Sequence, residues 1–296
     1  MDGDTRAGDS SSVIQVDRVS AQDCDEAGRL AFEAFKDIAD RHGFPPEFKS
    51  IHEARASARW LTSQEPVLGF AVRRRALEGV AYLSMIDEVA GIGPVAVDLS
   101  AQGQGTGRIL MQACLDAAVK HGHTRVRLMQ DAFNVGSLGL YASLGFQVVE
   151  PLAIVATPPA TAALAIREAD DEDLAELCRL YRERVGFDRS GEIHLAQRYR
   201  RSLLIEKGDQ IAGFVAGYSL SKAEFGFADD NETLVTIVAG QAALKGAPVQ
   251  WMLPMRHDGL LNAAIRAGST VVKMGNLMAF GPYEAPSAPH IVSFWY

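Results

Sequence analysis

The sequence predicts an α/β fold, of the α+β kind with mixed sheets, in two successive domains. Each domain has a central mixed sheet flanked by helices. Three observations lead to this prediction. Strand and helix patterns alternate along the chain and then repeat in nearly the same order after residue 163. Between the repeats, residues 153–163 contain two consecutive prolines and few large side chains, as linkers do. A chain of 296 residues is also long enough for two domains of ordinary size.

In the first half, Ser20 and Asp23 form a helix-start signature, and apolar residues then recur at helical spacing as far as Gly43. Ser50 and Glu53 open a second helix in the same way. The predicted order of elements is strand 13–19, helix 20–43, helix 50–60, strands 67–73, 79–86 and 91–99, helix 107–121, strand 125–130, helix 137–144 and closing strands over 146–155.

The second half repeats this order. A run of four acids from Asp170 to Asp173 suits the positive end of a helix dipole. The predicted elements are strand 165–167, a helix from 170, a hairpin with arms at 203–206 and 210–218, helix 232–244, strand 249–255, helix 257–267 and closing strands to 296. Residues 141–149 and 264–272 share a glycine and two valines at the same point of both layouts, which indicates an ancient duplication.

These patterns predict four segments. Residues 1–12 form a disordered tail, 13–157 a first domain, 158–163 a linker and 164–296 a second domain.

Charge and cysteine content narrow the class of protein. The net charge is −8 and the pI about 5.4, which argues against nucleic acid or an anionic membrane as the main partner. Cys24, Cys114 and Cys178 lie far apart without a CxxC pair, so we expect buried thiols, a reducing cytoplasm and no metal site. The N-terminus lacks the apolar core of a signal peptide, and no apolar run is long enough to cross a bilayer.

The most informative stretch runs from residue 93 to 108, with the sequence GPVAVDLSAQGQGTGR. A buried strand leads into glycines at alternate positions and then into an amphipathic helix. Glycines allow the backbone to approach a ligand closely, and a helix start offers unpaired N–H groups to a phosphate. A flexible turn without a ligand is the alternative. Two other phosphate-binding loops fit less well. A P-loop requires Gly-Lys-Ser/Thr, whereas this chain has Gly107-Arg108-Ile109. A dinucleotide fingerprint requires GxGxxG after the first strand, whereas this chain has GxGxG after several strands.

At these residues the chain resembles the GNAT superfamily of acyl-CoA N-acyltransferases. The coenzyme motif of that family, Gln/Arg-x-x-Gly-x-Gly/Ala, is met by Gln102, Gly105 and Gly107. The resemblance continues through residues 131–146, covers 13–157 closely, and holds beyond that only in layout. The residues that match the second signature of the family are Asn134, Ser137, Tyr141, Gly145 and Phe146.

The resemblance implies that acetyl-CoA is a co-substrate and that its acetyl group passes to a primary amine in a ternary complex. The acceptor is then a small molecule or a peptide terminus. Val95 and Val97 would bind the pantetheine arm through their backbones, and Asn134 and Ser137 would contact the coenzyme from the other side. The residues implied around the pyrophosphate are Gln102, Gly103, Gly105, Thr106, Gly107 and Arg108.

The resemblance also implies that Tyr141 lies near the sulfur and protonates the departing thiolate, and the chemistry supports this role. An amine that attacks a thioester forms an oxyanion and expels a thiolate, so a phenol can supply the proton. The alternative is that Tyr141 is a core aromatic. For the general base, Asp131, Asp87 and Glu88 are all candidates, and Asp131 is the one we favour. His42 is either an acceptor-site residue or a helix-end residue.

The second half lacks both signatures. If Gly268 matches Gly145, then Ala264 takes the place of Tyr141, and the segment before helix 232–244 has no glycine loop. We therefore interpret this half as a degenerate GNAT-like domain kept for packing, for shaping the acceptor pocket, or for forming a homodimer. The rival functions for the whole chain are a non-catalytic acyl-CoA sensor and a scaffold protein.

Overall fold

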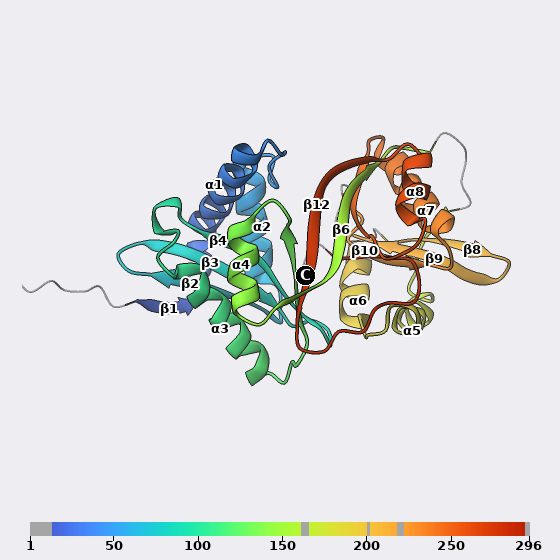
Figure 1. Ribbon diagram of the computed structural model, residues 1–296. Helices are drawn as coiled ribbons and strands as arrows, with labels where there is room; N and C mark the ends of the chain where they lie inside the picture. The colour runs from blue at the N-terminus through green and yellow to red at the C-terminus, as the bar shows by residue number, and fades with distance from the viewer. Residues whose placement is uncertain (1–13, 161–165, 200–201, 218–221, 294–296) are drawn as a thin grey trace, which may run out of the picture.

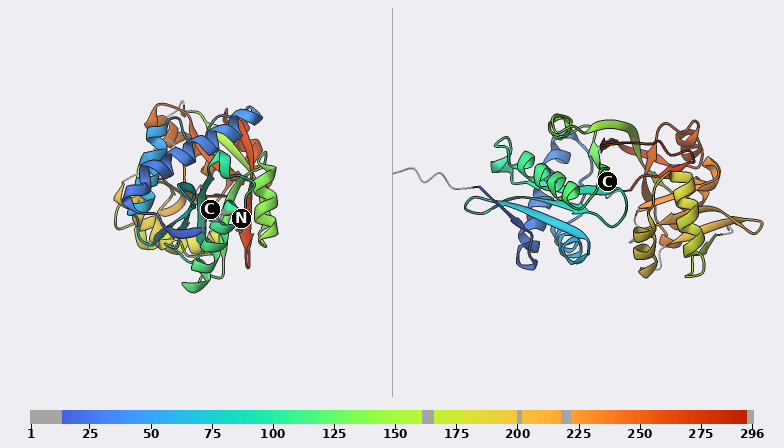
Figure 2. Two further views of the ribbon diagram at one scale, coloured as in Figure 1. Left: turned by 90° about the vertical axis from the view of Figure 1, so that its left-hand side faces the viewer. Right: turned by 90° about the horizontal axis from the view of Figure 1, so that it is seen from below.

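The computed structural model describes residues 14–160, 166–199, 202–217 and 222–293. The predicted tail 1–12 and residues 161–163 of the predicted linker lie outside these ranges. The described chain forms two lobes that lie side by side and are joined by two long strands, β6 and β12 (Figure 1). Figure 2 shows the same two lobes from the side and from below. None of the described helices is long and apolar enough to span a membrane.

The first half follows the predicted order closely. Ser50 caps the second helix by accepting a hydrogen bond from the backbone N–H of Glu53 at 3.2 Å, and Gly43 ends the first helix at a φ of 72°. Its elements are β1 (Gln15–Arg18), η1 (Ala21–Asp23), α1 (Cys24–His42), α2 (Ile51–Ser63), β2 (Val67–Arg73), β3 (Leu77–Ser84), β4 (Ala90–Val97), η2 (Leu99–Ala101), α3 (Thr106–Lys120), β5 (Val126–Asp131), α4 (Val135–Ser143) and β6 (Gln147–Thr157).

Helices cover both faces of the sheet formed by β1 to β5. Side chains alternate along a strand, so Ala71 and Tyr82 pack against α1 and α2, whereas Val72 and Leu83 pack against α3. The predicted class, a mixed sheet flanked by helices, is confirmed.

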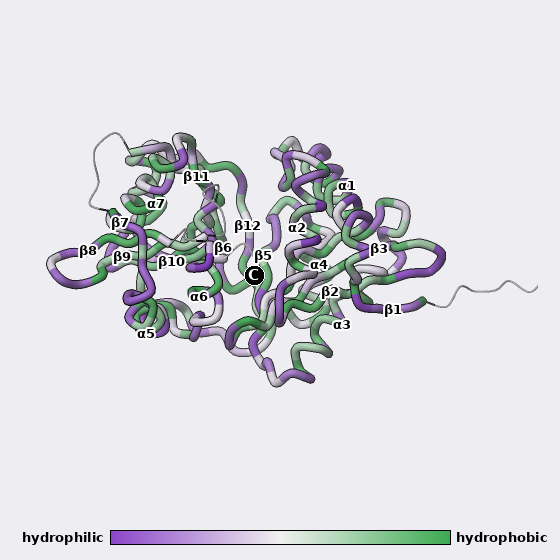
Figure 3. Tube along the Cα trace, turned by 180° about the vertical axis from the view of Figure 1, so that it is seen from behind, coloured by the Kyte–Doolittle hydropathy of each residue, from purple (hydrophilic) through white to green (hydrophobic). Residues whose placement is uncertain are grey.

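The second half contains two elements that the sequence pattern did not predict, α6 and β10. Strands β9 and β10 are hydrophobic over most of their length, while the turn between β8 and β9 is hydrophilic (Figure 3). The elements of this half are β7 (Ile166–Glu168), α5 (Leu174–Val185), α6 (Ser190–Arg198), β8 (Leu203–Lys207), β9 (Gln210–Ala216), β10 (Phe225–Ala228), α7 (Asn231–Lys245), β11 (Val249–Pro254), α8 (Leu260–Arg266), β12 (Thr270–Phe280) and β13 (His290–Ile291).

The closing strand of each half, β6 or β12, pairs with a strand of the other half. The larger sheet has the order β1-β2-β3-β4-β5-β12-β6-β11, so β12 from the second half lies between β5 and β6. The end of β12 pairs with β5 from Gly275↔Asp131 to Phe280↔Val126, and the end of β6 pairs with β11 from Leu152↔Pro254 to Thr157↔Val249. We expected each half to close its own sheet. The proposed domains, 13–157 and 164–296, instead share these two strands.

The hydrophobic core is continuous across the two halves for the same reason. Leu152 and Ile154 of β6 and Val89 of the first half pack in one cluster with Leu177 and Tyr181 of α5. Each of these five side chains is no more than 3% exposed.

We predict that neither half folds alone, because without β12 the edge of β5 is open and β6 has no partner within its own lobe. Chains 1–160 and 161–296 expressed separately should be unfolded or aggregated by circular dichroism and size exclusion. Co-expressed, they should form a stable 1:1 complex, with the full chain as the control. A folded, monomeric 1–160 chain would contradict this prediction.

Candidate functional site

A cavity of about 850 Å³ opens where β4 and β5 diverge. The two parallel strands pair only at Ala90↔Val126 and Gly91↔Arg127. Beyond Gly91 the chain reaches Pro94, which has no N–H to donate to a neighbouring strand. Residues of both separated strands line the cavity, so the split between β4 and β5 forms its floor.

The glycine loop opens one end of this cavity. Gly103 and Gly105 have φ values of 75° and 86°, and a Cβ built on either would meet no atom within 4 Å. Gly105 is the N-cap of α3, and no side chain hydrogen-bonds to this helix start. The N-terminal amides and the positive dipole end of α3 are therefore available to an anion, which fits a phosphate.

Nearly all of the predicted coenzyme contacts line this one cavity. The exception is Thr106, which is only 1% exposed and packs towards Gly79, so its side chain can contact no coenzyme. Those that line the cavity are Val95, Val97, Gln102, Gly103, Gly105, Gly107, Arg108, Asn134 and Ser137.

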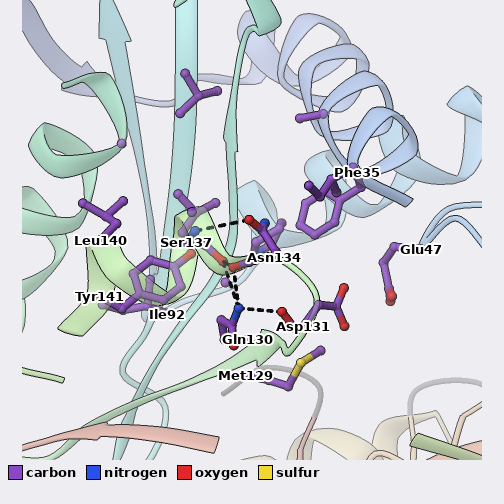
Figure 4. A pocket seen from close by; sticks show the side chains of 18 of the residues that line it. Phe35, Glu47, Ile92, Met129, Gln130, Asp131, Asn134, Ser137, Leu140 and Tyr141 are labelled. Carbon is purple, nitrogen blue, oxygen red and sulfur yellow. Dashed lines mark hydrogen bonds between the residues drawn. The ribbon is translucent and has the colours of Figure 1, made fainter. Parts of the chain in front are cut away.

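The turn from β5 into α4 is held by a group of hydrogen bonds (Figure 4). Asn134 caps α4 by accepting from the N–H of Ser137 at 3.2 Å, and the Ser137 hydroxyl donates to the Asn134 carbonyl at 3.0 Å. Gln130 donates to the same carbonyl at 2.7 Å. Its own side-chain oxygen accepts from Asn276 of β12 at 2.8 Å, so the exchanged strand holds this turn in place.

Tyr141 of α4 lines the cavity and packs against Phe146, with ring centroids 6.2 Å apart. Burial, and secondarily the neighbouring Cys114 and Asp131, raises the pKa of its phenol well above the ordinary value of 10. The hydroxyl is therefore protonated at neutral pH. It is available as a proton donor to a strong base that forms inside the cavity.

A network of charges from both halves forms the other end of the cavity. Glu47, in the loop after α1, accepts from Lys222 at 2.6 Å and pairs with Lys273 of β12 at 3.4 Å. Lys273 also contacts Asp131 at 2.8 Å. Figure 4 shows the carboxylates of Glu47 and Asp131 in the same part of the cavity.

The two carboxylates of this network are perturbed in opposite directions. Lys222, and then Lys273, hold the pKa of Glu47 at about 2 in spite of burial. Burial raises the pKa of Asp131, although Lys273 opposes that shift. Asp131 is thus buried and paired at the end of β5.

The other acids proposed as a general base lie outside the cavity lining. Asp87 accepts hydrogen bonds from the backbone N–H groups of Gly191 and Glu192 at 2.7 and 3.0 Å and so caps α6 across the boundary between the halves. A Cβ at Gly191 would lie 2.7 Å from the Ile86 side chain, so this contact requires glycine. Glu88 accepts from the backbone N–H of Asp188 at 3.1 Å. Both acids serve the interface between the halves.

His42 also does not line the cavity. Its Nδ1 lies 2.9 Å from the carbonyl of Ile38, and its ring lies against Phe133 with centroids 5.3 Å apart. Phe44 stacks on the Phe133 ring, with centroids 4.5 Å apart. This supports the helix-end alternative, in which His42 helps to hold the loop that carries Glu47.

Sequence reasoning missed Glu224, the acid that precedes β10. It lines the cavity, is 6% exposed, and burial raises its pKa to about 7. Glu192 and Glu47 add to this shift, while Lys222 and Arg189 oppose it. The signal in the sequence was an isolated acid directly before an apolar strand, in Ala223-Glu-Phe225, in a half that we interpreted as degenerate.

The corresponding site of the second half is filled by the chain itself. At the start of α7, the carboxylate of Asp230 accepts from the N–H of Thr233 at 2.7 Å and occupies the helix end that α3 leaves open. Between β10 and β11 lies β13, which pairs with Gly226 and Phe227 and bridges to Met252. In the described part of this half, the start of α7 is therefore capped and the gap between β10 and β11 is occupied.

Comparison with known proteins agrees with this architecture. Residues 32–146 match the model of the Acetyltransferase (GNAT) family. A candidate acetyltransferase from Pyrococcus horikoshii is similar over 95% of both chains, with 16% identity and a TM-score of 0.73. A GCN5-related N-acetyltransferase from Sphaerobacter thermophilus covers 93% of this chain and 98% of its own, with 16% identity and a TM-score of 0.65.

A tandem GNAT protein from the clavulanic acid biosynthesis pathway covers 92% of this chain and 100% of its own, with 12% identity and a TM-score of 0.57. No curated protein shows significant similarity to the sequence. At these identities the solved structures support the fold.

We predict that Glu47→Gln destabilises the protein by about 1–3 kcal/mol at pH 7, because two lysines lose a charged partner. The folded-state pKa of Glu47 lies below its ordinary value of 4.5, so its contribution is complete above about pH 4.5 and is lost as the pH falls towards 2. Urea denaturation of both proteins between pH 3 and 7 measures the difference.

Glu232→Gln is the matched control, because Glu232 is exposed and pairs with Arg266 at 3.3 Å. It should change stability by less than about 0.5 kcal/mol. A pH-independent difference between wild type and Glu47→Gln would contradict the charge network.

Proposed function

Since residues 32–146 make this chain a member of the GNAT superfamily of acetyltransferases, we propose that it transfers the acetyl group of acetyl-CoA to a primary amine. The acceptor is a small molecule or a peptide terminus. The observation that carries the proposal is the uncapped start of α3, which opens into the same cavity as the Tyr141 side chain. An anion site and a proton donor together fit a coenzyme that carries phosphates at one end and a thioester at the other.

The coenzyme lies along the split between the strands in this proposal. Its pyrophosphate binds the amides at the start of α3, and Arg108, held by a 2.7 Å hydrogen bond to Ser143, adds positive charge. The pantetheine arm follows Val95 and Val97 of β4, on the edge of the strand that β5 leaves unpaired after Gly91. Asn134 and Ser137 form the opposite wall.

Transfer then proceeds by direct attack in a ternary complex. The amine nitrogen attacks the thioester carbonyl carbon, an oxyanion forms, and the C–S bond breaks to expel the thiolate. The Tyr141 hydroxyl donates its proton to the thiolate. Its raised pKa means that the phenol carries this proton at neutral pH.

Asp131 lies on the acceptor side of the thioester in this arrangement. The sequence favoured it as the general base, and its raised pKa suits that role. Both of its oxygens, however, lie within 3.0 Å of Lys273, so protonation of Asp131 would remove the nearer of the two carboxylates that pair with that ammonium. We therefore assign Asp131 a positioning role, in which it and Lys273 shape the acceptor end of the cavity.

The experiment that tests the whole proposal is mass spectrometry of a primary-amine library incubated with the protein and acetyl-CoA. Acetylated products that require both protein and acetyl-CoA support it. Coenzyme binding without any acetylated product would favour an acyl-CoA sensor, and absence of coenzyme binding would favour a scaffold.

We predict that the chain binds one CoA and that Gly105→Glu abolishes this binding, because the new carboxylate enters the phosphate space at the start of α3. Calorimetry should give a stoichiometry near one for the wild type. Gly122→Glu is the matched control, since Gly122 also has a positive φ, 87°, with nothing within 4 Å of its Cβ position, but lies at the other end of α3. Unchanged affinity in Gly105→Glu would place the coenzyme elsewhere.

We also predict that Tyr141→Phe lowers turnover by roughly two to four orders of magnitude and leaves CoA affinity unchanged, since only the proton donor is removed. This corresponds to about 3–5 kcal/mol of activation free energy. The control is Tyr283→Phe, which removes a buried hydroxyl that no described group hydrogen-bonds. Steady-state kinetics with the best amine decide the matter, and turnover above a third of the wild-type rate would refute the acid role.

A further inference from the structure

Glu224 is a buried acid, and its Oε2 has no hydrogen-bond partner among the described residues. Among the described residues, the second half contributes Lys222 and Glu224 to the cavity lining. Glu224 is 6% exposed, and no described group donates a hydrogen bond to its Oε2. A buried carboxylate oxygen without a donor is costly to a folded protein, and the nearby charges of Lys222 and Arg189 offset only part of that cost. A ligand that supplies a cation or a donor would remove it.

The position of Glu224 is fixed by the backbone on both sides. Its N–H donates to the carbonyl of Ala216 at 2.8 Å, and the N–H of Ala223 donates to the carbonyl of Gln250 at 2.9 Å. Lys222 forms a parallel bridge with the same Gln250 of β11. The acid is therefore presented to the cavity by the sheets of the second half.

We propose that Glu224 binds the ammonium group of the acceptor and takes its proton, so that the second half supplies the general base for a coenzyme held by the first half. This inference rests on the proposed acetyl transfer and deepens it. It also narrows the acceptor to a molecule whose primary amine is protonated in solution, since an ammonium group can donate a hydrogen bond to the unpaired Oε2.

The proton balance of the reaction is complete with this residue. The first ammonium proton passes to the Glu224 carboxylate and is released to water after the reaction. The neutral amine forms the new C–N bond as the C–S bond breaks, and the thiolate takes the proton of Tyr141. The nitrogen then loses its second proton, which returns through water to the Tyr141 oxygen. One proton per turnover reaches the solvent.

The surroundings of Glu224 suit a base that works near neutral pH. Lys222 and Arg189 favour its charged form, while burial, Glu192 and Glu47 oppose it, and these influences leave its pKa at about 7. A base is most effective when its pKa lies near the working pH. Asp131 differs in that Lys273 hydrogen-bonds to its Oδ2 at 3.0 Å and lies 2.8 Å from its Oδ1 as an ion-pair partner.

The test compares Glu224→Gln, Asp131→Asn and the exposed control Glu232→Gln in the full chain, with acetyl-CoA and the best amine of the library, from pH 5.5 to 9. We expect kcat/KM of Glu224→Gln to fall about 10²- to 10⁴-fold at pH 8 and to lose the rise with pH near 7 that the wild type shows. Its affinity for CoA and the activity of Glu232→Gln should match the wild type.

A second measurement needs no acceptor. Because the pKa of Glu224 is raised in the folded state, the wild type loses stability as the pH rises from about 4.5 through 7, and the glutamine variant avoids this loss. The melting temperature of Glu224→Gln should therefore rise relative to that of the wild type between pH 5 and 8.

The inference is overturned if the wild type acetylates amines and Glu224→Gln is equally active with the same pH profile. Loss of the pH-dependent limb in Asp131→Asn alone would overturn it in favour of Asp131. Failure of the wild type to acetylate any amine while it binds CoA would instead overturn the proposed function itself.

Discussion

The antiparallel pairing of β12 with both β5 and β6 is the constraint on which the rest of the structure depends. Neither half can complete its sheet without a strand from the other. The core is therefore buried in the same folding step that pairs the exchanged strands. The core cluster that joins Leu152 and Ile154 of β6 to Leu177 of α5 follows directly from this exchange. The second half therefore contributes a strand, β12, to the sheet of the half that carries the glycine loop.

Side chains of the exchanged strand β12 also contact residues of the candidate site. Asn276 fixes the Gln130 side chain, which in turn holds the carbonyl of Asn134 at the start of α4, the helix that carries Tyr141. Three residues earlier on β12, Lys273 contacts Asp131. A strand from the second half thus fixes the turn into the helix that carries Tyr141 and places a positive charge beside Asp131. We propose that this is why the second half has been retained without a coenzyme site of its own.

Local patterns in the sequence predicted the fold class, most elements and the glycine loop, because each depends on residues close together in the chain. The sequence did not reveal α6, which begins where Asp87 of the other half caps it, or β10, which has only four residues. Strand exchange was also hidden, since β6 and β12 are apolar enough to pair with either sheet. The acceptor end, with Lys222 and Glu224, is assembled from distant elements and could not be predicted from spacing.

The two halves differ at the starts of two corresponding helices, α3 and α7. The glycine at the N-cap of α3 leaves its amides open, whereas Asp230 satisfies the amides of α7 with its own carboxylate. Once that carboxylate is present, a phosphate at α7 would meet negative charge and lose its donors. With no phosphate bound at α7, no ligand needs the gap between β10 and β11. Strand β13 occupies that gap. Lys222 and Glu224, which lie just before β10, line the cavity beside the split between β4 and β5, so the second half contributes charged side chains to it.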